Sequence, residues 1–409
     1  MDIRINPKPL GGTVTPPSSK SMAHRLLIAA ALANGVSTVY NVALSQDIAA
    51  TLRCVAALGS TWEQPEAGVI RIRGIGGKLP KRNSPLPRFD CGESGSTLRF
   101  LIPIALATAG GGVFTGQGRL MERPQQPYFD LFDDRGINHE WNEGVLTVRG
   151  ALPSGEYRLP GNVSSQFFTG LLFALPLLAG NSTLVSTTTL ESSGYISMTL
   201  EALRAAGITA VGRPEQGLYQ VRSGAYRPFN ATVEADWSQA AFWYAANVLG
   251  GDLQIDGLNA CSAQGDMAVS EYARTLSRPG DVSIDVSGCP DLVPPLSVMA
   301  AVRQGTTHLT NAARLRLKES DRLKTTAAML TALGGDAEEG ADSLMIRGVP
   351  HLSGGTVDGA NDHRIVMAAA IAATRCAGPV TILGSEAINK SYPSFFEDYL
   401  ALGGDVHGV

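Results

Sequence analysis

The stretch from Thr15 to Gly35 gathers residue types that could bind an anion. Two prolines precede the run Ser-Ser-Lys-Ser at positions 18–21, and apolar residues at helical spacing follow it. The run is therefore predicted to begin a helix, whose first turn offers unpaired backbone N–H groups and a partial positive charge. Lys20, Ser21 and Arg25 would add an ammonium, a hydroxyl and a guanidinium to that end. Taken alone, the stretch fits an ordinary serine cap with a solvated lysine better than an anion site, so other segments must decide.

Further polar clusters stand where helices are predicted to begin or in the loops between them. They are CGESGSTLRF at 91–100, GQGRLMERPQQP at 116–127, GNVSSQFFTG at 161–170, RLRLKESDRLK at 314–324, NDHRIVMAAA at 361–370 and KSYP at 390–393. Each cluster alone is ordinary, because a Gly/Ser turn is usually only a turn and a charge run is usually a solvated helix face. Taken together, the clusters share predicted helix starts, hydroxyl groups and arginines. One arginine guanidinium can bind two oxygens of a carboxylate or phosphate at once. The set predicts a cleft that binds a polyanion, with lysines and carboxylates nearby as acids and bases.

The composition narrows the class of protein. With 409 residues, 44% of them hydrophobic, the chain can bury a large core and is long enough for two domains or more. Its formal charge of −4 argues against a nucleic-acid partner. The five cysteines lie far apart, the six histidines form no HExxH pattern, and the nucleotide signature GxxxxGK[ST] is absent, so we expect neither metal nor cofactor. No apolar run reaches the roughly 20 residues of a membrane helix and no signal peptide begins the chain, which predicts a cytoplasmic protein without a membrane partner.

One pattern recurs along the chain: a helix ends near a glycine, and two short strands joined by a polar turn follow. Copies start at Leu52, Leu131, Leu200 and Met329, a less clear copy lies at 272–288, and a truncated copy ends the chain. The glycine supplies a left-handed helix cap, and an alternating strand such as 69–73 has one face to bury. The segments 170–180 and 365–374 are apolar almost all round, as buried helices are. About six units predict two similar α/β lobes of three units each, with helices packed inside sheets.

The boundary between the lobes is expected within 226–232, where proline and asparagine interrupt the pattern. Three units precede this segment and three follow it. The N-terminal strand at 3–5 fits either lobe.

Taken together, these segments resemble the enolpyruvyl transferases, and within them the branch that acts on shikimate 3-phosphate. The resemblance runs nearly end to end, through SSKSMAHR, the glycine loop before Leu98-Arg99, GRLMERP, SSQ, the turn at 192–195, Pro290-Asp291, KESDR, NDHR and Lys390. It implies an α/β fold of two lobes, each of three βαβαββ units with buried helices, as an inside-out barrel. It further implies that residues 16–227 form lobe one, mainly for shikimate 3-phosphate. Residues 1–15 and 228–409 would form lobe two and complete the phosphoenolpyruvate site in the cleft.

The activity implied by the resemblance is transfer of the carboxyvinyl group of phosphoenolpyruvate to the 5-hydroxyl of shikimate 3-phosphate, with release of phosphate. By position in the motifs, the phosphoenolpyruvate site would comprise Lys20, Gly95, Arg119, Gln166, Arg322, His363, Arg364 and Lys390. The shikimate 3-phosphate site would comprise Lys20, Ser21, Arg25, Ser164, Ser165, Gln166, Ser192, Tyr195, Asp291 and Lys318.

Addition to the double bond needs a base for the 5-hydroxyl and an acid for the methylene carbon, after which the tetrahedral intermediate loses phosphate. We assign the base to Asp291 and the proton at carbon to Glu319, with Lys20 assisting departure of phosphate. Lobe closure would exclude water from these steps.

Two positions depart from the family pattern. The glycine loop commonly reads Asn-Ala-Gly-Thr, whereas Glu93-Ser94-Gly95-Ser96 stands here and puts an acid beside the expected phosphoenolpyruvate. Sensitivity to glyphosate is therefore left open. The family often carries asparagine four residues before the KESDR lysine, but this chain has Arg314, so one contact on the shikimate side is expected to differ.

Two alternative functions share part of this pattern. The UDP-N-acetylglucosamine enolpyruvyl transferases share fold and donor, but usually have a cysteine in the mobile loop and Lys-Asn near the N-terminus. Here 111–124 holds no cysteine and Lys20 precedes Ser21, which disfavours that branch. A non-catalytic phosphometabolite-binding protein would not need the acids Asp291 and Glu319. No interface pattern is visible, and we expect a monomer.

Overall fold

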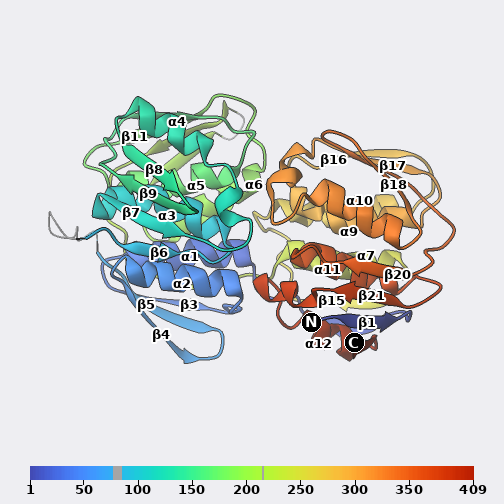
Figure 1. The fold of residues 1–409 in the computed structure, drawn as a ribbon. Coiled ribbons are helices and arrows are strands. Elements are labelled where there is room, and N and C mark those ends of the chain that lie inside the picture. The colour runs from blue at the N-terminus through green and yellow to red at the C-terminus, as the bar shows by residue number, and fades with distance from the viewer. Residues whose placement is uncertain (77–84, 214–215) are drawn as a thin grey trace. The chain divides into compact units, whose positions relative to one another are not determined.

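The computed structural model describes residues 1–76, 85–213 and 216–409, which form two compact units (Figure 1). One unit is Ser18–Glu234, and the other combines Met1–Pro17 with Ala235–Val409. The turn of the hairpin predicted after Leu200 includes 214 and 215, which lie outside the described residues.

The Ser18–Glu234 unit repeats one supersecondary pattern three times. In each copy a parallel strand pair is connected through a helix, and a second helix leads to an antiparallel hairpin. The second copy contains β6 (Arg88–Asp90), α3 (Gly95–Ala109), β7 (Gly111–Thr115), α4 (Gln126–Asp134), β8 (Asn138–Asn142) and β9 (Val145–Arg149), in sheet order β6-β7-β9-β8. The third contains β10 (Glu156–Leu159), α5 (Ser165–Ala174), β11 (Ser182–Ser186), α6 (Ser193–Ala205), β12 (Ala210–Arg213) and β13 (Leu218–Val221), in sheet order β10-β11-β13-β12.

The first copy of this unit is assembled from distant segments. Its strand β14 (Asn230–Thr232) pairs in parallel with β3 (Val36–Tyr40), so the end of the unit closes its beginning. The remaining elements are α1 (Lys20–Leu32), α2 (Gln46–Ala57), β4 (Thr61–Glu66) and β5 (Val69–Arg73), in sheet order β14-β3-β5-β4. The strand predicted at 69–73 is confirmed as β5.

The other unit contains two complete copies and one reduced copy. The first complete copy comprises β16 (Val282–Asp285), α9 (Val293–Ala301), β17 (Thr306–Thr310), α10 (Arg322–Ala332), β18 (Asp336–Glu339) and β19 (Leu344–Arg347). The second comprises β20 (Gly355–Asp358), α11 (His363–Ala373), β21 (Val380–Leu383), α12 (Phe395–Ala401), β22 (Asp405–Gly408) and β1 (Ile3–Asn6). Strand β1 lies between β21 and β22 and is antiparallel to both, which assigns the N-terminal strand to this unit.

The reduced copy explains why the repeat is least clear at 272–288. Its elements are β2 (Gly11–Val14), α7 (Trp237–Val248), β15 (Asp252–Ile255) and α8 (Val269–Leu276). Strands β2 and β15 pair in parallel, and within the described chain their sheet has only these two strands. The predicted α/β class with two lobes of three repeated units is confirmed, with this one unit lacking its hairpin.

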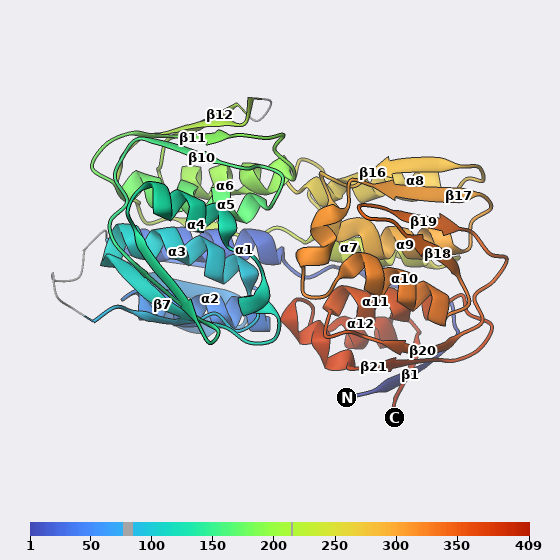
Figure 2. The ribbon, with the colours of Figure 1, turned by 45° about the horizontal axis from the view of Figure 1, so that its top comes forward.

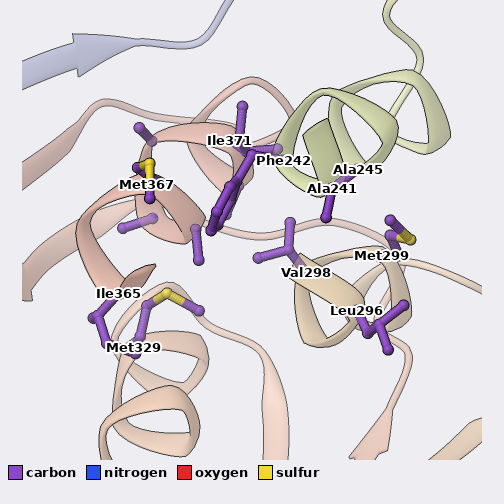
Figure 3. Close-up of a cluster of buried hydrophobic side chains, with 14 of the residues drawn as sticks. Ala241, Phe242, Ala245, Leu296, Val298, Met299, Met329, Ile365, Met367 and Ile371 are labelled. Atoms are coloured by element: carbon purple, nitrogen blue, oxygen red, sulfur yellow. The ribbon is translucent and has the colours of Figure 1, made fainter. Parts of the chain in front are cut away.

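Helices lie inside each unit and the sheets lie outside them (Figure 2). All residues of α11 and all of α9 are buried, as expected for helices that are apolar on every side. Figure 3 shows side chains of α7, α9, α10 and α11 meeting in one cluster, among them Phe242, Val298, Met329 and Ile371. Each large apolar side chain so buried contributes about 1.5–3 kcal/mol, so this cluster stabilises the packing of the four helices. None of the helices in the described part of the chain is long and apolar enough to span a membrane.

Candidate active site

The first helix of the Ser18–Glu234 unit begins where the sequence predicts. Ser19 caps α1, and its Oγ accepts a hydrogen bond from Met22 N over 3.3 Å. Lys20 is the first helical residue, and its Nζ donates to Asp47 Oδ2 over 2.9 Å. Asp47 stands in the first turn of α2 and was not among the predicted site residues. The ammonium of Lys20 is therefore held at the helix start by a carboxylate that comes from another helix.

Arg25 is a buried cation one turn further along α1. Its Nε donates to Thr199 Oγ1 over 2.9 Å and its Nη1 to Ser21 O over 2.6 Å. The guanidinium also lies 5.2 Å from the Phe100 ring centroid and 5.8 Å from that of Tyr195. Burial lowers the pKa of Arg25 to about 10, so the side chain stays charged at neutral pH. Hydroxyls, a carbonyl and rings do not neutralise this charge, which makes an anionic group a favourable partner.

The starts of α3 and α5 are joined by polar side chains. Ser164 caps α5 and accepts from Gln166 N over 3.3 Å. The Gln166 side chain accepts from Arg99 Nη1 over 2.8 Å and donates to Ser96 Oγ over 3.0 Å. Ser165 is buried beside them. Gln166 thus connects the start of α5, where Ser164 and Ser165 lie, to the first turns of α3.

Ser192 and Tyr195 lie at the start of α6. Ser192 is buried and has a positive φ of 55°, which is unusual for a residue with a side chain. Tyr195 N donates to Ser192 O over 3.1 Å, and the Tyr195 ring faces Arg25. These two predicted residues therefore belong to the same part of the unit as Arg25.

Arg123 lies against the glycine loop. A Cβ on Gly95 would be 2.7 Å from Arg123 Nη1, so the glycine lets the guanidinium reach the backbone at the start of α3. Arg123 is only 6% exposed, whereas the Arg119 side chain is 46% exposed and lies 3.7 Å from Glu122. Both arginines occur in the GRLMERP motif, and burial distinguishes them. We add Arg123 to the candidate residues, and Arg119 stays a prediction.

Buried His24 connects α1 to α2 and α3 through a chain of hydroxyl groups. His24 Nδ1 lies 2.7 Å from Thr51 Oγ1, which lies 2.7 Å from Thr97 Oγ1. Thr97 Oγ1 donates to Ser94 Oγ, the cap of α3, over 2.8 Å. Burial, and after it the charges of Lys20 and Arg25, lower the pKa of His24 well below its ordinary value. The imidazole is therefore neutral and links α1, α2 and α3 without adding charge.

Arg322 organises the candidate residues of the other unit. This side chain is 1% exposed, and its three nitrogens reach three carboxylates. Nη1 donates to Asp291 Oδ1 over 2.8 Å, Nη2 to Glu319 Oε2 over 2.6 Å, and Nε to Asp362 Oδ2 over 2.8 Å. Burial alone would lower the pKa of Arg322, but Asp362, Glu319 and Asp291 together raise it above the ordinary value. One permanently charged guanidinium thus holds both carboxylates that the sequence analysis assigned to acid–base roles.

Two further cationic side chains donate hydrogen bonds to the Asp291 carboxylate. Lys318 Nζ donates to Oδ1 over 3.2 Å, and Arg364 Nη2 donates to Oδ2 over 3.2 Å. Arg364 also donates to the Asp291 backbone oxygen over 3.1 Å. Asp291 precedes α9, while Lys318 and Arg322 flank the start of α10 and Arg364 stands in the first turn of α11. Five of the predicted residues, Asp291, Lys318, Glu319, Arg322 and Arg364, therefore meet at the starts of three helices.

Two further predicted residues, His363 and Lys390, lie at the start of α11 or contact the residues before it. Asp362, fully buried, caps this helix by accepting from Arg364 N over 3.0 Å. His363 follows it and is buried, and Lys390 Nζ donates to Asn361 O over 2.6 Å. The sequence analysis includes Asp362 in the NDHR cluster but assigns it no role, although an aspartate before an apolar helix is a recognisable cap signal.

Arg314, which stands where the family often has asparagine, is buried in the segment before Lys318. Its Nη2 donates to Ser287 O over 2.6 Å and so connects the segment before Lys318 to the segment that follows β16. Among the described residues no group of three or more His, Cys, Asp or Glu side chains could hold a metal ion.

The two clusters suit different chemical tasks. In the Ser18–Glu234 unit, cations and hydroxyls at helix starts fit a phosphate and a hydroxylated ring. In the other unit, two carboxylates on a shared guanidinium fit proton transfer beside an anionic substrate.

Comparisons with known proteins give consistent matches. The family model described as EPSP synthase (3-phosphoshikimate 1-carboxyvinyltransferase) matches residues 5–399. A 3-phosphoshikimate 1-carboxyvinyltransferase from Clostridium acetobutylicum is 43% identical, covering 99% of this chain and 98% of the relative, and one from Clostridium kluyveri is 42% identical with the same coverage. The solved EPSP synthase from Acinetobacter baumannii is 25% identical with a TM-score of 0.81 over 100% of both chains. The enolpyruvyl transferase NikO from Streptomyces tendae shares the fold, with a TM-score of 0.78 and 18% identity over 99% of this chain and 98% of that chain.

Proposed function

The chain belongs to the EPSP synthase (3-phosphoshikimate 1-carboxyvinyltransferase) family, and from this premise we propose which of its residues carry out the reaction. It transfers the enolpyruvyl group of phosphoenolpyruvate to shikimate 3-phosphate, a step of aromatic amino acid biosynthesis. The family predicted from the ordered sequence motifs is confirmed.

The observation that supports our assignment of the chemistry is the shared guanidinium of Arg322. Asp291 and Glu319 are hydrogen-bonded to different nitrogens of this group, over 2.8 and 2.6 Å. Two carboxylates held side by side in fixed orientations can act on two atoms of one substrate pair. We assign the base that takes the 5-hydroxyl proton to Asp291 and the acid that protonates the methylene carbon to Glu319.

The proposed reaction has two balanced steps. In the addition, Asp291 starts as the carboxylate and Glu319 starts protonated. Asp291 takes the hydroxyl proton, the oxygen forms a bond to carbon 2 of phosphoenolpyruvate, and the double-bond electrons take the proton of Glu319 at carbon 3. In the elimination, Glu319 takes a proton back from carbon 3, the double bond re-forms, and the carbon–oxygen bond to phosphate breaks. The departing phosphate receives the proton held by Asp291, and Lys20 stabilises its developing charge.

Each proposed substrate site takes residues from both clusters. For phosphoenolpyruvate we propose Lys20, Gly95, Arg119, Gln166, Arg322, His363, Arg364 and Lys390, to which burial against Gly95 adds Arg123. For shikimate 3-phosphate we propose Lys20, Ser21, Arg25, Ser164, Ser165, Gln166, Ser192, Tyr195, Asp291 and Lys318. Arg25 is buried and forms no ion pair with a carboxylate among the described residues, which supports a phosphate contact at that position.

The function is tested by phosphate release from phosphoenolpyruvate in the presence of shikimate 3-phosphate. Parallel reactions contain UDP-N-acetylglucosamine or no acceptor, and release only with shikimate 3-phosphate is expected. Asp291→Asn and Lys20→Met should each lower kcat by at least about 100-fold, the usual weight of a positioned acid–base or charge-stabilising group. Near-normal turnover in either variant would refute the role assigned to that residue.

We also propose that the enzyme acts as a monomer in the cytoplasm. Size-exclusion chromatography with light scattering should return the mass of one chain, both alone and with the two substrates. A mass of two chains would refute the monomer.

A further inference from the structure

The turn that precedes α3 and the loop that follows β7 are in direct contact within the Ser18–Glu234 unit. Gln117 N donates to Gly92 O over 2.7 Å. Gly118, which has a φ of 54°, faces the side chain of Glu93. A Cβ on Gly118 would lie 2.6 Å from Oε2 and 2.8 Å from Cδ of Glu93, so the carboxylate packs directly on the loop backbone. Only a glycine fits at position 118 while Glu93 keeps this place.

Hydrogen bonds in successive turns connect this contact to Arg123. Leu120 N donates to Gln117 O over 3.1 Å, and Arg123 N donates to Leu120 O over 3.3 Å. The Arg123 guanidinium then returns to the glycine loop and lies against Gly95. The segment 117–123 is therefore held near both ends by the turn 92–95, and a shift at its first end would move the arginine at its second.

We propose that Glu93 is a positioning residue for phosphoenolpyruvate binding: its carboxylate, packed on Gly118, holds the loop so that the Arg123 guanidinium faces the start of α3. This inference rests on the proposed function, in which Gly95 and Arg123 contact phosphoenolpyruvate. This role would explain why Glu93 stands in the glycine loop, although its negative charge by itself would repel the anionic substrate.

The positioning role and simple repulsion predict opposite signs for one substitution. If Glu93 positions Arg123, Glu93→Ala weakens phosphoenolpyruvate binding, because the loop loses its support. If Glu93 only repels the anion, Glu93→Ala strengthens binding. We expect the KM for phosphoenolpyruvate to rise roughly 10-fold, within the range of coupling between contacting residues, while the KM for shikimate 3-phosphate and the melting temperature change little. An unchanged or lower KM for phosphoenolpyruvate would overturn the proposal.

A double-mutant cycle tests the contact itself. Gly118→Ala forces a methyl group onto the carboxylate and should also raise the KM for phosphoenolpyruvate. In Glu93→Ala/Gly118→Ala the clash is gone, so the KM should be no higher than in Glu93→Ala alone. Effects that multiply in the double variant would contradict direct contact.

Gly136→Ala is the matched control for backbone strain. Gly136 has a similar φ of 63° on an exposed turn of the same unit, and a Cβ there would meet nothing within 4 Å. This variant should lower stability slightly without changing the KM for phosphoenolpyruvate. If Gly118→Ala behaves in the same way, its effect is only strain and the proposal fails.

Arg123→Lys separates this inference from the proposed function. If Arg123→Lys leaves the KM for phosphoenolpyruvate unchanged, Arg123 does not bind the substrate. Both the proposed contact of Arg123 and the positioning role of Glu93 are then refuted. If Arg123→Lys raises that KM while Glu93→Ala does not, the proposed contact stands and the role of Glu93 alone is refuted.

Discussion

Replacing Asp362 by asparagine tests whether the buried charge network around Arg322 supports the fold as well as the site. Asp362 is fully buried and accepts four hydrogen bonds. Oδ2 accepts from Arg322 Nε over 2.8 Å and from Ser320 Oγ over 2.9 Å, and Oδ1 accepts from Arg322 Nη2 over 3.2 Å and from Arg364 N over 3.0 Å. Asp362→Asn keeps one oxygen for the helix cap, but it replaces the other by an NH2 group that faces Arg322 Nε, which can only donate.

The expected loss follows from these contacts. Breaking a buried ion pair by neutralising one partner costs about 3–5 kcal/mol. Arg322 keeps Asp291 and Glu319 as partners, and asparagine remains a good helix cap, so we expect the lower end, about 3 kcal/mol of unfolding free energy. Urea unfolding measures this loss, with fluorescence of Trp237 and Trp243, which belong to the same unit as Asp362.

Asp321→Asn is the matched control. Asp321 caps the neighbouring helix α10, accepting from Lys324 N, and its Oδ2 accepts from Arg316 Nη1 over 2.8 Å. The chemical change is the same, but the side chain is 29% exposed, so the loss should stay below about 1 kcal/mol. Equal losses in the two variants would refute the reasoning, because burial of the charge would then not set the cost.

Two further substitutions test the packing of the Ser18–Glu234 unit. Because the folded-state pKa of His24 is lowered, the unfolded imidazole binds a proton first as pH falls below about 6.5, and the wild type should lose up to about 1.4 kcal/mol of stability per pH unit there. His24→Gln should lack this component, so urea midpoints at pH 7 and 5.5 that fall equally in both proteins would contradict it. Gly170→Ala should lower the melting temperature although alanine favours helices, because its Cβ would lie 2.4 Å from both Arg99 O and Tyr128 Oη, and overpacking costs roughly 1–3 kcal/mol. An unchanged or higher melting temperature would show that α5 can shift away from α3.

Features set by nearby residues were predictable from the sequence alone. The cap at Ser19, the strand at 69–73 and the buried helix at 365–374 each depend on residue types within a few positions. The repeat count and the family follow from motifs in order along the chain, and so does the grouping of Lys318, Glu319 and Arg322. These features can be predicted without a structure because caps, periodicity and the spacing within each motif depend on residues within one or two helical turns.

Features set by residues far apart in sequence required the tertiary structure. The repeat pattern alone left the N-terminal strand with either lobe, and pairing with β21 and β22 places it in the unit that contains 235–409. Nothing near Lys20 indicates Asp47, and nothing near Arg322 indicates that Asp362 completes its set of carboxylates. Arg119 and Arg123 occur in the same sequence motif, which does not show which of them lies at the site. The structure shows that Arg123 is buried against Gly95. The reason is physical: the packing of whole helices and sheets determines which helix starts meet, and no short stretch of sequence contains that information.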